Sequence, residues 1–140
     1  MPTRQELQEL ARVRLREAEH LYRAGLYDGC VYLCGYVVEF ALKARICRVL
    51  RLEKYPDAGK FSALFKNHDF ELLRRLAGLE LSKELSKGTQ LATNWSTATE
   101  WSPERRYTPV GTVNQKTASN VLASIKDRPN GVLTWLSKRW

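Results

Sequence analysis

The sequence predicts an all-α protein, an up-and-down bundle of four to five helices with a short extra helix near its C-terminal end. Three observations lead to this prediction. Apolar residues recur at helical spacing along most of the chain, Gly and Pro interrupt the pattern at short intervals, and no segment alternates strongly enough for a strand. With 140 residues, of which 44% are hydrophobic, the chain fits one domain, residues 1–140, with its own core.

The first two predicted helices are the longest. The first extends from Thr3 to about Ala24, because Thr3 and Glu6 have the spacing of a capping box and Gly25 is suited to end a helix. The second extends from residue 27 to about residue 52, with Asp28 as the expected cap. A stripe of small and apolar residues on this helix is predicted to face the core: Cys30, Cys34, Val37, Ala41 and Ala44.

The rest of the chain contains shorter elements. Residues 53–66 include Pro and Gly and are expected to form a loop with at most one helical turn. Three further helices are predicted over residues 69–79, 82–97 and 114–126, and residues 132–140 are predicted to form the short last helix after a turn that contains Pro and Gly.

Charge and cysteine content narrow the functional classes. The net charge of +8 favours attraction to a polyanion such as RNA or DNA. The three cysteines have no His or second Cys pair at metal-ligand spacing, so buried, unreactive thiols are expected. The sequence lacks a phosphate-binding loop, a His-Glu helix motif and an acidic cluster suited to hold Mg²⁺. These absences predict no cofactor and no metal. Without an uncharged apolar run of about 18 residues or an apolar leader, a cytoplasmic protein without a membrane partner is expected.

The second predicted helix carries a polar stripe within its apolar sequence. At about 100° per residue, one narrow face opposite the cysteine and valine stripe contains Tyr32, Tyr36, Glu39 and Lys43. Arg14 lies in the middle of the apolar face of the first helix, where a guanidinium needs a carboxylate partner. Two interpretations follow: Glu39 pairs with Arg14 and fixes the register of two antiparallel helices, or the stripe belongs to a ligand or partner surface.

Three segments of the chain resemble the HEPN domain family (higher eukaryotes and prokaryotes nucleotide-binding). GLYDGCVYLCGYVVEFALKARI, residues 25–46, is similar to the second helix of these domains, with a Tyr-Asp start, small residues in the middle and a Glu four residues before a Lys. NHDFELLRRLAGL, residues 67–79, resembles the His-Asp-hydrophobic segment that opens the third helix. WSPERRY, residues 101–107, resembles a compact subgroup in which a Trp, an acidic residue and an Arg-Tyr pair precede the last helix.

The resemblance implies a helical bundle that commonly forms a homodimer in prokaryotic toxin–antitoxin or defence systems, in many cases with a nucleotidyltransferase partner. Many family members are metal-independent RNases. They place an Arg and a His, separated by four to six residues, at the dimer cleft. The His acts there as acid or base, and the Arg stabilises the charge of the phosphorane.

This chain lacks the Arg–His motif at the family's usual place, so it resembles a subgroup without the RNase motif. No Arg stands at the required spacing before His68, where the residues are Phe61, Ser62 and Ala63. Arg14 has that spacing from His20, but on a helix the two lie about 120° away from a shared face, and we interpret the match as accidental. The catalytic candidates are therefore limited to His68, His20 and Arg14.

Two segments of the chain are candidate binding sites. His68 precedes a predicted helix, where Asp69 or the imidazole caps backbone N–H groups, or where His68 binds a phosphate together with Lys66. In the loop TEWSPERRYTPVG, residues 99–111, aromatic faces suit base stacking, guanidinium groups suit phosphate, and a carboxylate accepts from an amino or ribose hydroxyl group. The residues concerned are Trp101, Glu104, Arg105, Arg106 and Tyr107. The alternative is that the two aromatic residues anchor the loop on the bundle while the carboxylate pairs with an Arg.

Two functions follow, and whether the protein is an enzyme stays open between them. The missing motif favours a non-catalytic HEPN-like module that binds a nucleotide, a nucleic acid or a partner protein. The alternative is a divergent, metal-independent RNase toxin acting at a homodimer cleft. Three apolar residues are candidates for the dimer contact or for covering the core: Phe61, Leu64 and Phe65.

Overall fold

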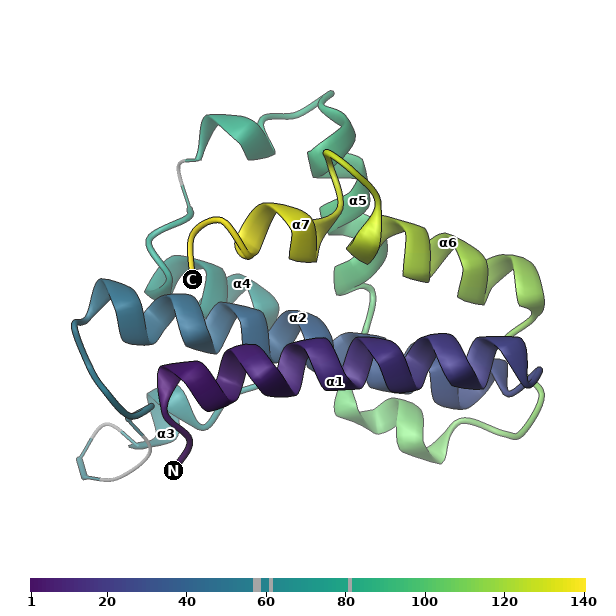
Figure 1. Cartoon of the computed structure of the whole chain (residues 1–140), viewed down its shortest axis with the longest axis horizontal. Helices are drawn as coiled ribbons and strands as arrows, with labels where there is room; N and C mark the ends of the chain where they lie inside the picture. The colour runs from purple at the N-terminus through teal and green to yellow at the C-terminus, as the bar shows by residue number, and fades with distance from the viewer. Residues whose placement is uncertain (57–58, 61, 81) are drawn as a thin grey trace.

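The computed structural model describes residues 1–56, 59–60, 62–80 and 82–140. Within these residues the regular elements are helices, and one isolated antiparallel bridge joins Thr3 to Lys54. The all-α prediction is therefore confirmed (Figure 1). The α-helices are α1 (Arg4–Arg23), α2 (Tyr27–Val49), α3 (Ser62–Phe65), α4 (Phe70–Leu76), α5 (Gln90–Thr99), α6 (Gln115–Lys126) and α7 (Val132–Leu136), with two 3-10 helices, η1 (Lys83–Leu85) and η2 (Pro103–Tyr107).

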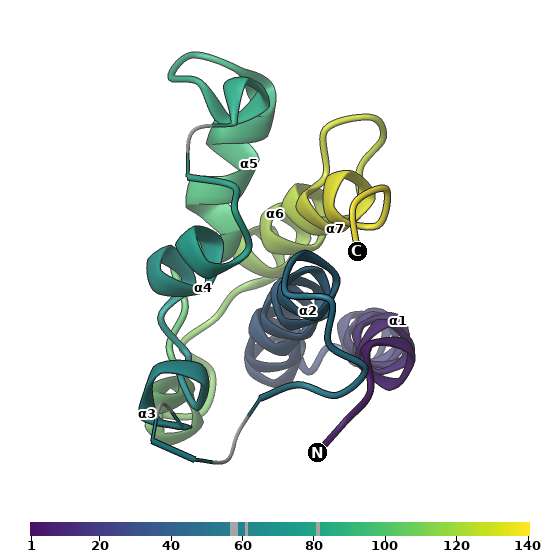
Figure 2. The same ribbon diagram turned by 90° about the vertical axis from the view of Figure 1, so that its left-hand side faces the viewer.

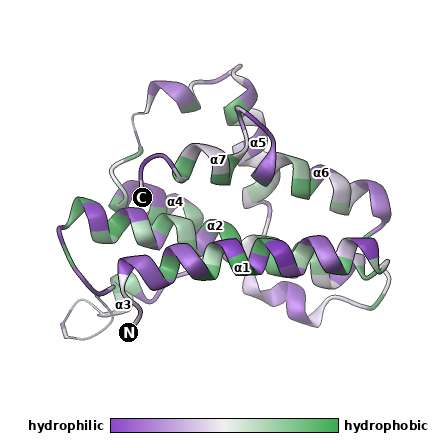
Figure 3. Cartoon of the chain, viewed as in Figure 1, coloured by the Kyte–Doolittle hydropathy of each residue, from purple (hydrophilic) through white to green (hydrophobic). Residues whose placement is uncertain are grey.

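Helix α2 is the central element of the bundle. It packs against α1, α4, α5, α6, α7 and η2, and Figure 2 shows α1 on one side of it and α4 and α5 on the other. Such a helix has to be apolar on most of its surface, which explains its sequence. In Figure 3, by contrast, α1 alternates hydrophilic and hydrophobic residues along its length, as a helix with one solvent-facing side does. None of the described helices is both long and apolar enough to cross a membrane.

Both ends of α1 form as the sequence predicts. The capping box of α1 is present, with the Glu6 amide donating to Thr3 Oγ1 over 3.1 Å and the Thr3 amide donating to Glu6 Oε2 over 2.7 Å. The chain reverses at Gly25, whose φ of 76° favours glycine. The two long helices consequently lie antiparallel (Figure 1).

Asp28 does not cap α2, which corrects that prediction. The helix has no side-chain cap, and the carboxylate of Asp28 instead accepts hydrogen bonds from the amides of Gly111 (2.6 Å) and Val113 (2.8 Å). It thus fastens the segment after η2 to the first turn of α2. The partners are more than eighty residues away in sequence, so spacing alone could not reveal them.

The pH dependence of this fastening is predictable. The hydrogen bonds from Val113 and Gly111 lower the pKa of Asp28 from its ordinary value of 3.8. A carboxyl group with a lowered folded-state pKa stabilises the fold above its unfolded pKa, and this contribution is lost as the pH falls through the folded pKa.

We expect Asp28→Asn, which keeps one acceptor oxygen, to reduce hydrogen-exchange protection at Gly111 or Val113 at pH 7. Unchanged protection at both amides would contradict this role, and the amides of α6 serve as the internal control.

Other element boundaries differ from the predictions in four places, one of which is the end of α4, at Leu76 instead of residue 79. Helix α2 ends at Val49 instead of residue 52, and α7 covers only the first part of residues 132–140. The predicted helix over residues 82–97 is wrong in its first half, because Gly88 has a φ of 92° and Thr89 caps a new helix by accepting from the Ala92 amide. Helix α4 begins as predicted, with the carboxylate of Asp69 capping it.

The apolar residues considered for dimer contacts behave differently from one another. Leu64 is 38% exposed, whereas Phe65 packs against the core and its carbonyl accepts from the Tyr55 hydroxyl. Phe61 lies outside the described residues. Homodimer formation therefore remains an expectation.

Candidate functional site

A groove lies between the segment that enters α4 and the segment that leads from α5 into η2. Its volume is about 580 Å³, and it is lined by residues 66–71 on one side and by Thr99 and residues 101–104 on the other. It therefore brings His68 together with Trp101 and Glu104, which the sequence placed in two separate candidate regions. A shallow hollow of about 600 Å³ continues from it along Glu100, Arg105 and Thr108, and the two share Trp101, Ser102 and Glu104.

A buried carboxylate positions His68 in this groove. Glu39 of α2 is only 2% exposed, and its two oxygens accept from different side chains, Oε1 from Lys43 Nζ at 2.6 Å and Oε2 from His68 Nδ1 at 2.7 Å. The proposed pairing of Glu39 with Arg14 is wrong. Arg14 lies at the partly exposed side of α1 and forms its ion pair with Glu17, one helical turn away.

The imidazole of His68 has one nitrogen committed and one available. Nδ1 binds Glu39, whereas Nε2 has no hydrogen-bond partner among the described residues, and the side chain is 49% exposed. Such a nitrogen accepts a proton when the ring is neutral and donates to an anion when it is charged. The geometry therefore suits acid–base chemistry or phosphate binding.

The polar stripe of α2 exists as predicted, but other groups cover much of it. The hydroxyls of Tyr32 and Tyr36 lie 3.3 Å apart, and the ring of Tyr36 contacts both His68 and Trp101 edge to face. Burial, followed by the hydrogen bond to Tyr32, raises the pKa of Tyr36 to about 12. The raised pKa reflects a phenol that is partly removed from water and bonded to its neighbour on the same helix face.

Trp101 anchors its loop on the bundle, as one of the two interpretations of this segment expects. Its indole Nε1 donates to the Tyr32 carbonyl over 3.0 Å, and its ring lies against those of Tyr36 and Phe70. The ring occupies the space above Gly35, where an added Cβ would lie only 2.0 Å from it. Because α2 and Phe70 already contact the indole, we do not assign it as a stacking platform.

Tyr107 and the two arginines before it lie beyond the anchor and are more open. Tyr107 is 72% exposed, with the Arg106 guanidinium 4.8 Å from its ring centroid, so it does not anchor the loop. Arg105 donates to the Glu100 carbonyl over 3.1 Å. Glu104 forms no ion pair with any described residue. Arg105 is partly exposed and the other three residues are exposed, and together they form an edge beside the groove.

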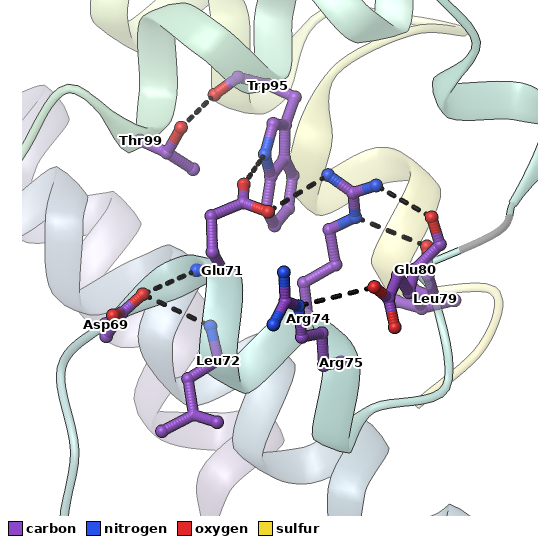
Figure 4. A network of polar contacts seen from close by, with 9 residues as sticks. All are labelled: Asp69, Glu71, Leu72, Arg74, Arg75, Leu79, Glu80, Trp95 and Thr99. Atoms are coloured by element: carbon purple, nitrogen blue, oxygen red, sulfur yellow. Dashed lines mark hydrogen bonds and ion pairs between the residues drawn. The ribbon is translucent and has the colours of Figure 1, made fainter.

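Glu71 is a site residue that the sequence reasoning missed. Its carboxylate lines the groove and is fixed by two donors, the indole of Trp95 on Oε1 (3.2 Å) and Arg74 Nη1 on Oε2 (3.3 Å). Arg74 in turn donates to the Leu79 and Glu80 carbonyls (Figure 4). The spacing of Glu71 and Arg74 on one helix could have suggested their pair, but nothing local indicates the contact with Trp95.

The remaining catalytic candidates lie outside the groove. His20 is exposed on α1 and its Nδ1 lies 3.2 Å from Arg23, while Arg14 pairs with Glu17. Neither residue lines the groove that contains His68. Over the described residues, no group of three or more His, Cys, Asp or Glu side chains is placed to hold a metal ion.

Comparison with known proteins identifies one family. A family model described as HEPN domain matches residues 5–127, from the second residue of α1 to the residue after α6, and this range includes the whole groove. A search of curated proteins finds no match, and a search of solved structures finds none either.

Proposed function

Because the chain belongs to the HEPN domain family, whose members are in general nucleotide-binding or RNase-like modules, we propose that it binds RNA or a nucleotide in the groove beside α4. The observation that carries this proposal is the convergence of His68, Lys66 and Glu104 on one groove that continues towards Arg105. In this interpretation the protein is a non-catalytic binding module, since the family's Arg–His motif is missing.

Each side chain of the site suits a different part of a nucleotide. Lys66 in the groove, Arg105 in the adjoining hollow and the neighbouring Arg106 supply phosphate contacts, and the net charge of +8 attracts a polyanion. Tyr107 supplies an exposed aromatic face for a base. Glu104, without an ion-pair partner in the described chain, accepts from an amino group or a ribose hydroxyl.

The arginine edge gives a direct test of RNA binding. Each phosphate contact that is removed lowers the dependence of log K on log salt by roughly one for duplexes and about 0.7 for single strands. We expect Arg105→Ala/Arg106→Ala to weaken binding of a labelled single-stranded RNA and to reduce the salt slope by about 1.4. Lys126→Ala/Arg128→Ala, at the end of α6 and in the turn after it, removes two exposed charges outside the groove and is the matched control. Equal losses in both variants would contradict a specific role for the edge.

RNA cleavage is a second candidate function, favoured by the contact between Glu39 and His68. A carboxylate that holds one imidazole nitrogen orients the other for proton transfer. His68 Nε2 would take the proton of a ribose 2′-OH as its oxygen attacks phosphorus, and would return it to the leaving 5′-oxygen. Lys66 would offset the charge on phosphorus. Incubation with a labelled RNA pool in EDTA tests this: cleavage that disappears in His68→Ala supports it, and binding without cleavage contradicts it.

The biological setting proposed here follows from the family resemblance. We place the protein in a prokaryotic toxin–antitoxin or defence system, as a homodimer with a possible nucleotidyltransferase partner. Light scattering tests the homodimer, and a strictly monomeric protein at high concentration would remove any site shared between two subunits.

A further inference from the structure

We propose that Glu71 makes the groove selective for guanine, by accepting the two adjacent N–H donors on the base's Watson–Crick edge. This inference rests on the proposed nucleotide binding, which it refines by naming the base. Three features of the groove support this inference. The carboxylate of Glu71 is held in place, hydrogen-bond donors and acceptors lie in different parts of the groove, and the neighbouring carboxylates are less suited to bind a base.

Glu71 is preorganised as an acceptor. Trp95 holds Oε1 and Arg74 holds Oε2 (Figure 4). Trp95 is only 5% exposed, whereas the side chain of Glu71 stays 60% exposed. Each carboxylate oxygen has a second lone pair, so both oxygens can still accept from a ligand. Arg74 is itself tied to two backbone carbonyls. A ligand therefore meets a fixed carboxylate and loses little entropy in ordering it.

Donors and acceptors occupy different parts of the groove. Lys66 and Asn67 contribute donors on the segment before α4, because Asn67 Oδ1 is occupied by the Asp69 amide (2.6 Å) and leaves its NH₂ group available, and His68 Nε2 adds a donor when the ring is charged. Glu71 and Glu104 contribute acceptors. A nucleotide satisfies both parts when its phosphate lies on the donor side and a donor-rich base edge lies on the acceptor side.

Guanine matches the acceptor side better than the other bases do. Its Watson–Crick edge presents N1–H and an N2 amino group side by side, which suits the two oxygens of one carboxylate. Adenine and cytosine present an amino group beside a ring nitrogen acceptor, and uracil presents one N–H between two carbonyls, so a carboxylate faces a lone pair in each of them. The carboxylate thus attracts guanine and opposes the alternatives.

The neighbouring carboxylates are less suited to this role. Asp69 Oδ1 caps α4 by accepting from the amides of Glu71 and Leu72. Glu104 is exposed on η2, and no described donor holds its carboxylate in one position. Glu71 alone among these three combines a fixed geometry with open lone pairs.

Calorimetric titration with GMP and IMP tests the inference, because inosine lacks only the N2 amino group. One bidentate contact is worth a discrimination of about tenfold, so we expect GMP to bind about tenfold more tightly than IMP and than AMP. Glu71→Gln, which retains an acceptor for Trp95 but replaces one oxygen with a donor, should bring the GMP to IMP ratio close to one. Glu80→Gln is the matched control, because Glu80 is an exposed glutamate that pairs with Arg75 and does not line the groove.

The outcomes separate this inference from the proposed function. Equal affinities for GMP, IMP and AMP in the unchanged protein, or a GMP preference that survives Glu71→Gln, would overturn guanine selectivity and leave nucleotide binding intact. Absence of binding by every nucleotide and by RNA would overturn both. A circular dichroism melt of Glu71→Gln, compared with that of Glu80→Gln, shows whether a lost preference reflects the groove or a damaged fold.

Discussion

Glu39→Ala is expected to lower the free energy of unfolding by about 3–5 kcal/mol, the usual effect of removing one partner from a buried ion pair. The carboxylate is 2% exposed, and it neutralises Lys43, whose side chain is only 12% exposed. The substitution leaves that ammonium without its carboxylate inside the bundle and releases His68 from its position. Urea denaturation at pH 7 measures the change.

A surface ion pair provides the control for this prediction. Glu17 pairs with Arg14 on the partly exposed side of α1, at the same 2.6 Å separation as Glu39 and Lys43. Exposed pairs contribute about 0–1 kcal/mol, so Glu17→Ala should change stability by less than about 1 kcal/mol. Similar effects of Glu17→Ala and Glu39→Ala would mean that burial of Glu39 has no energetic consequence, contrary to our interpretation.

Gly35→Ala is expected to destabilise the fold by about 1–3 kcal/mol, or somewhat more, because it overpacks a rigid contact. The new Cβ would lie 2.0 Å from two atoms of the Trp101 ring, which also packs against Tyr36 and Phe70. The indole has to move, and the segment leading into η2 moves with it. We therefore expect a loss of RNA binding together with the loss of stability, measured by denaturation and by RNA titration.

Another glycine of the same helix is the comparison for this variant. Among the described residues, an alanine at Gly29 would meet only the Cδ1 of Leu21, at 3.2 Å, and that flexible side chain can shift. Alanine also favours a helix over glycine by up to about 1 kcal/mol, so Gly29→Ala should be close to neutral. A Gly35→Ala protein as stable as Gly29→Ala would show that Trp101 is not fixed where the structure places it.

The sequence predicted the helices where local signals were strong. The Thr3–Glu6 capping box, Gly25 and Asp69 each mark a helix end by backbone chemistry within a few residues, and the structure has these ends. The helix predicted over residues 82–97 was wrong because its apolar spacing concealed the break at Gly88. Local signals therefore predicted several helix ends correctly, although Asp28, which has the chemistry of a cap, binds the distant amides of Gly111 and Val113 instead.

The site was predicted only in pieces, since its contacts join distant segments. The polar stripe of α2 follows from helical spacing, but Glu39 meets His68 across 29 residues and Trp101 meets the Tyr32 carbonyl across 69. Choosing Arg14 as the partner of Glu39 was a mistake of this kind. An ion-pair partner for a buried carboxylate can lie on any element that packs against it, and sequence spacing does not say which.

The four indole N–H groups report most directly whether the groove beside α4 is the binding site. Trp101 lines the groove and Trp95 holds Glu71, whereas Trp135 and Trp140 lie in α7 and after it. In a ¹H–¹⁵N titration with a short single-stranded RNA, with signals assigned by Trp→Phe variants, we predict shifts of the Trp101 and Trp95 indole resonances and none at the other two. Saturating RNA that shifts only the Trp135 and Trp140 signals, or none of the four, would contradict this assignment.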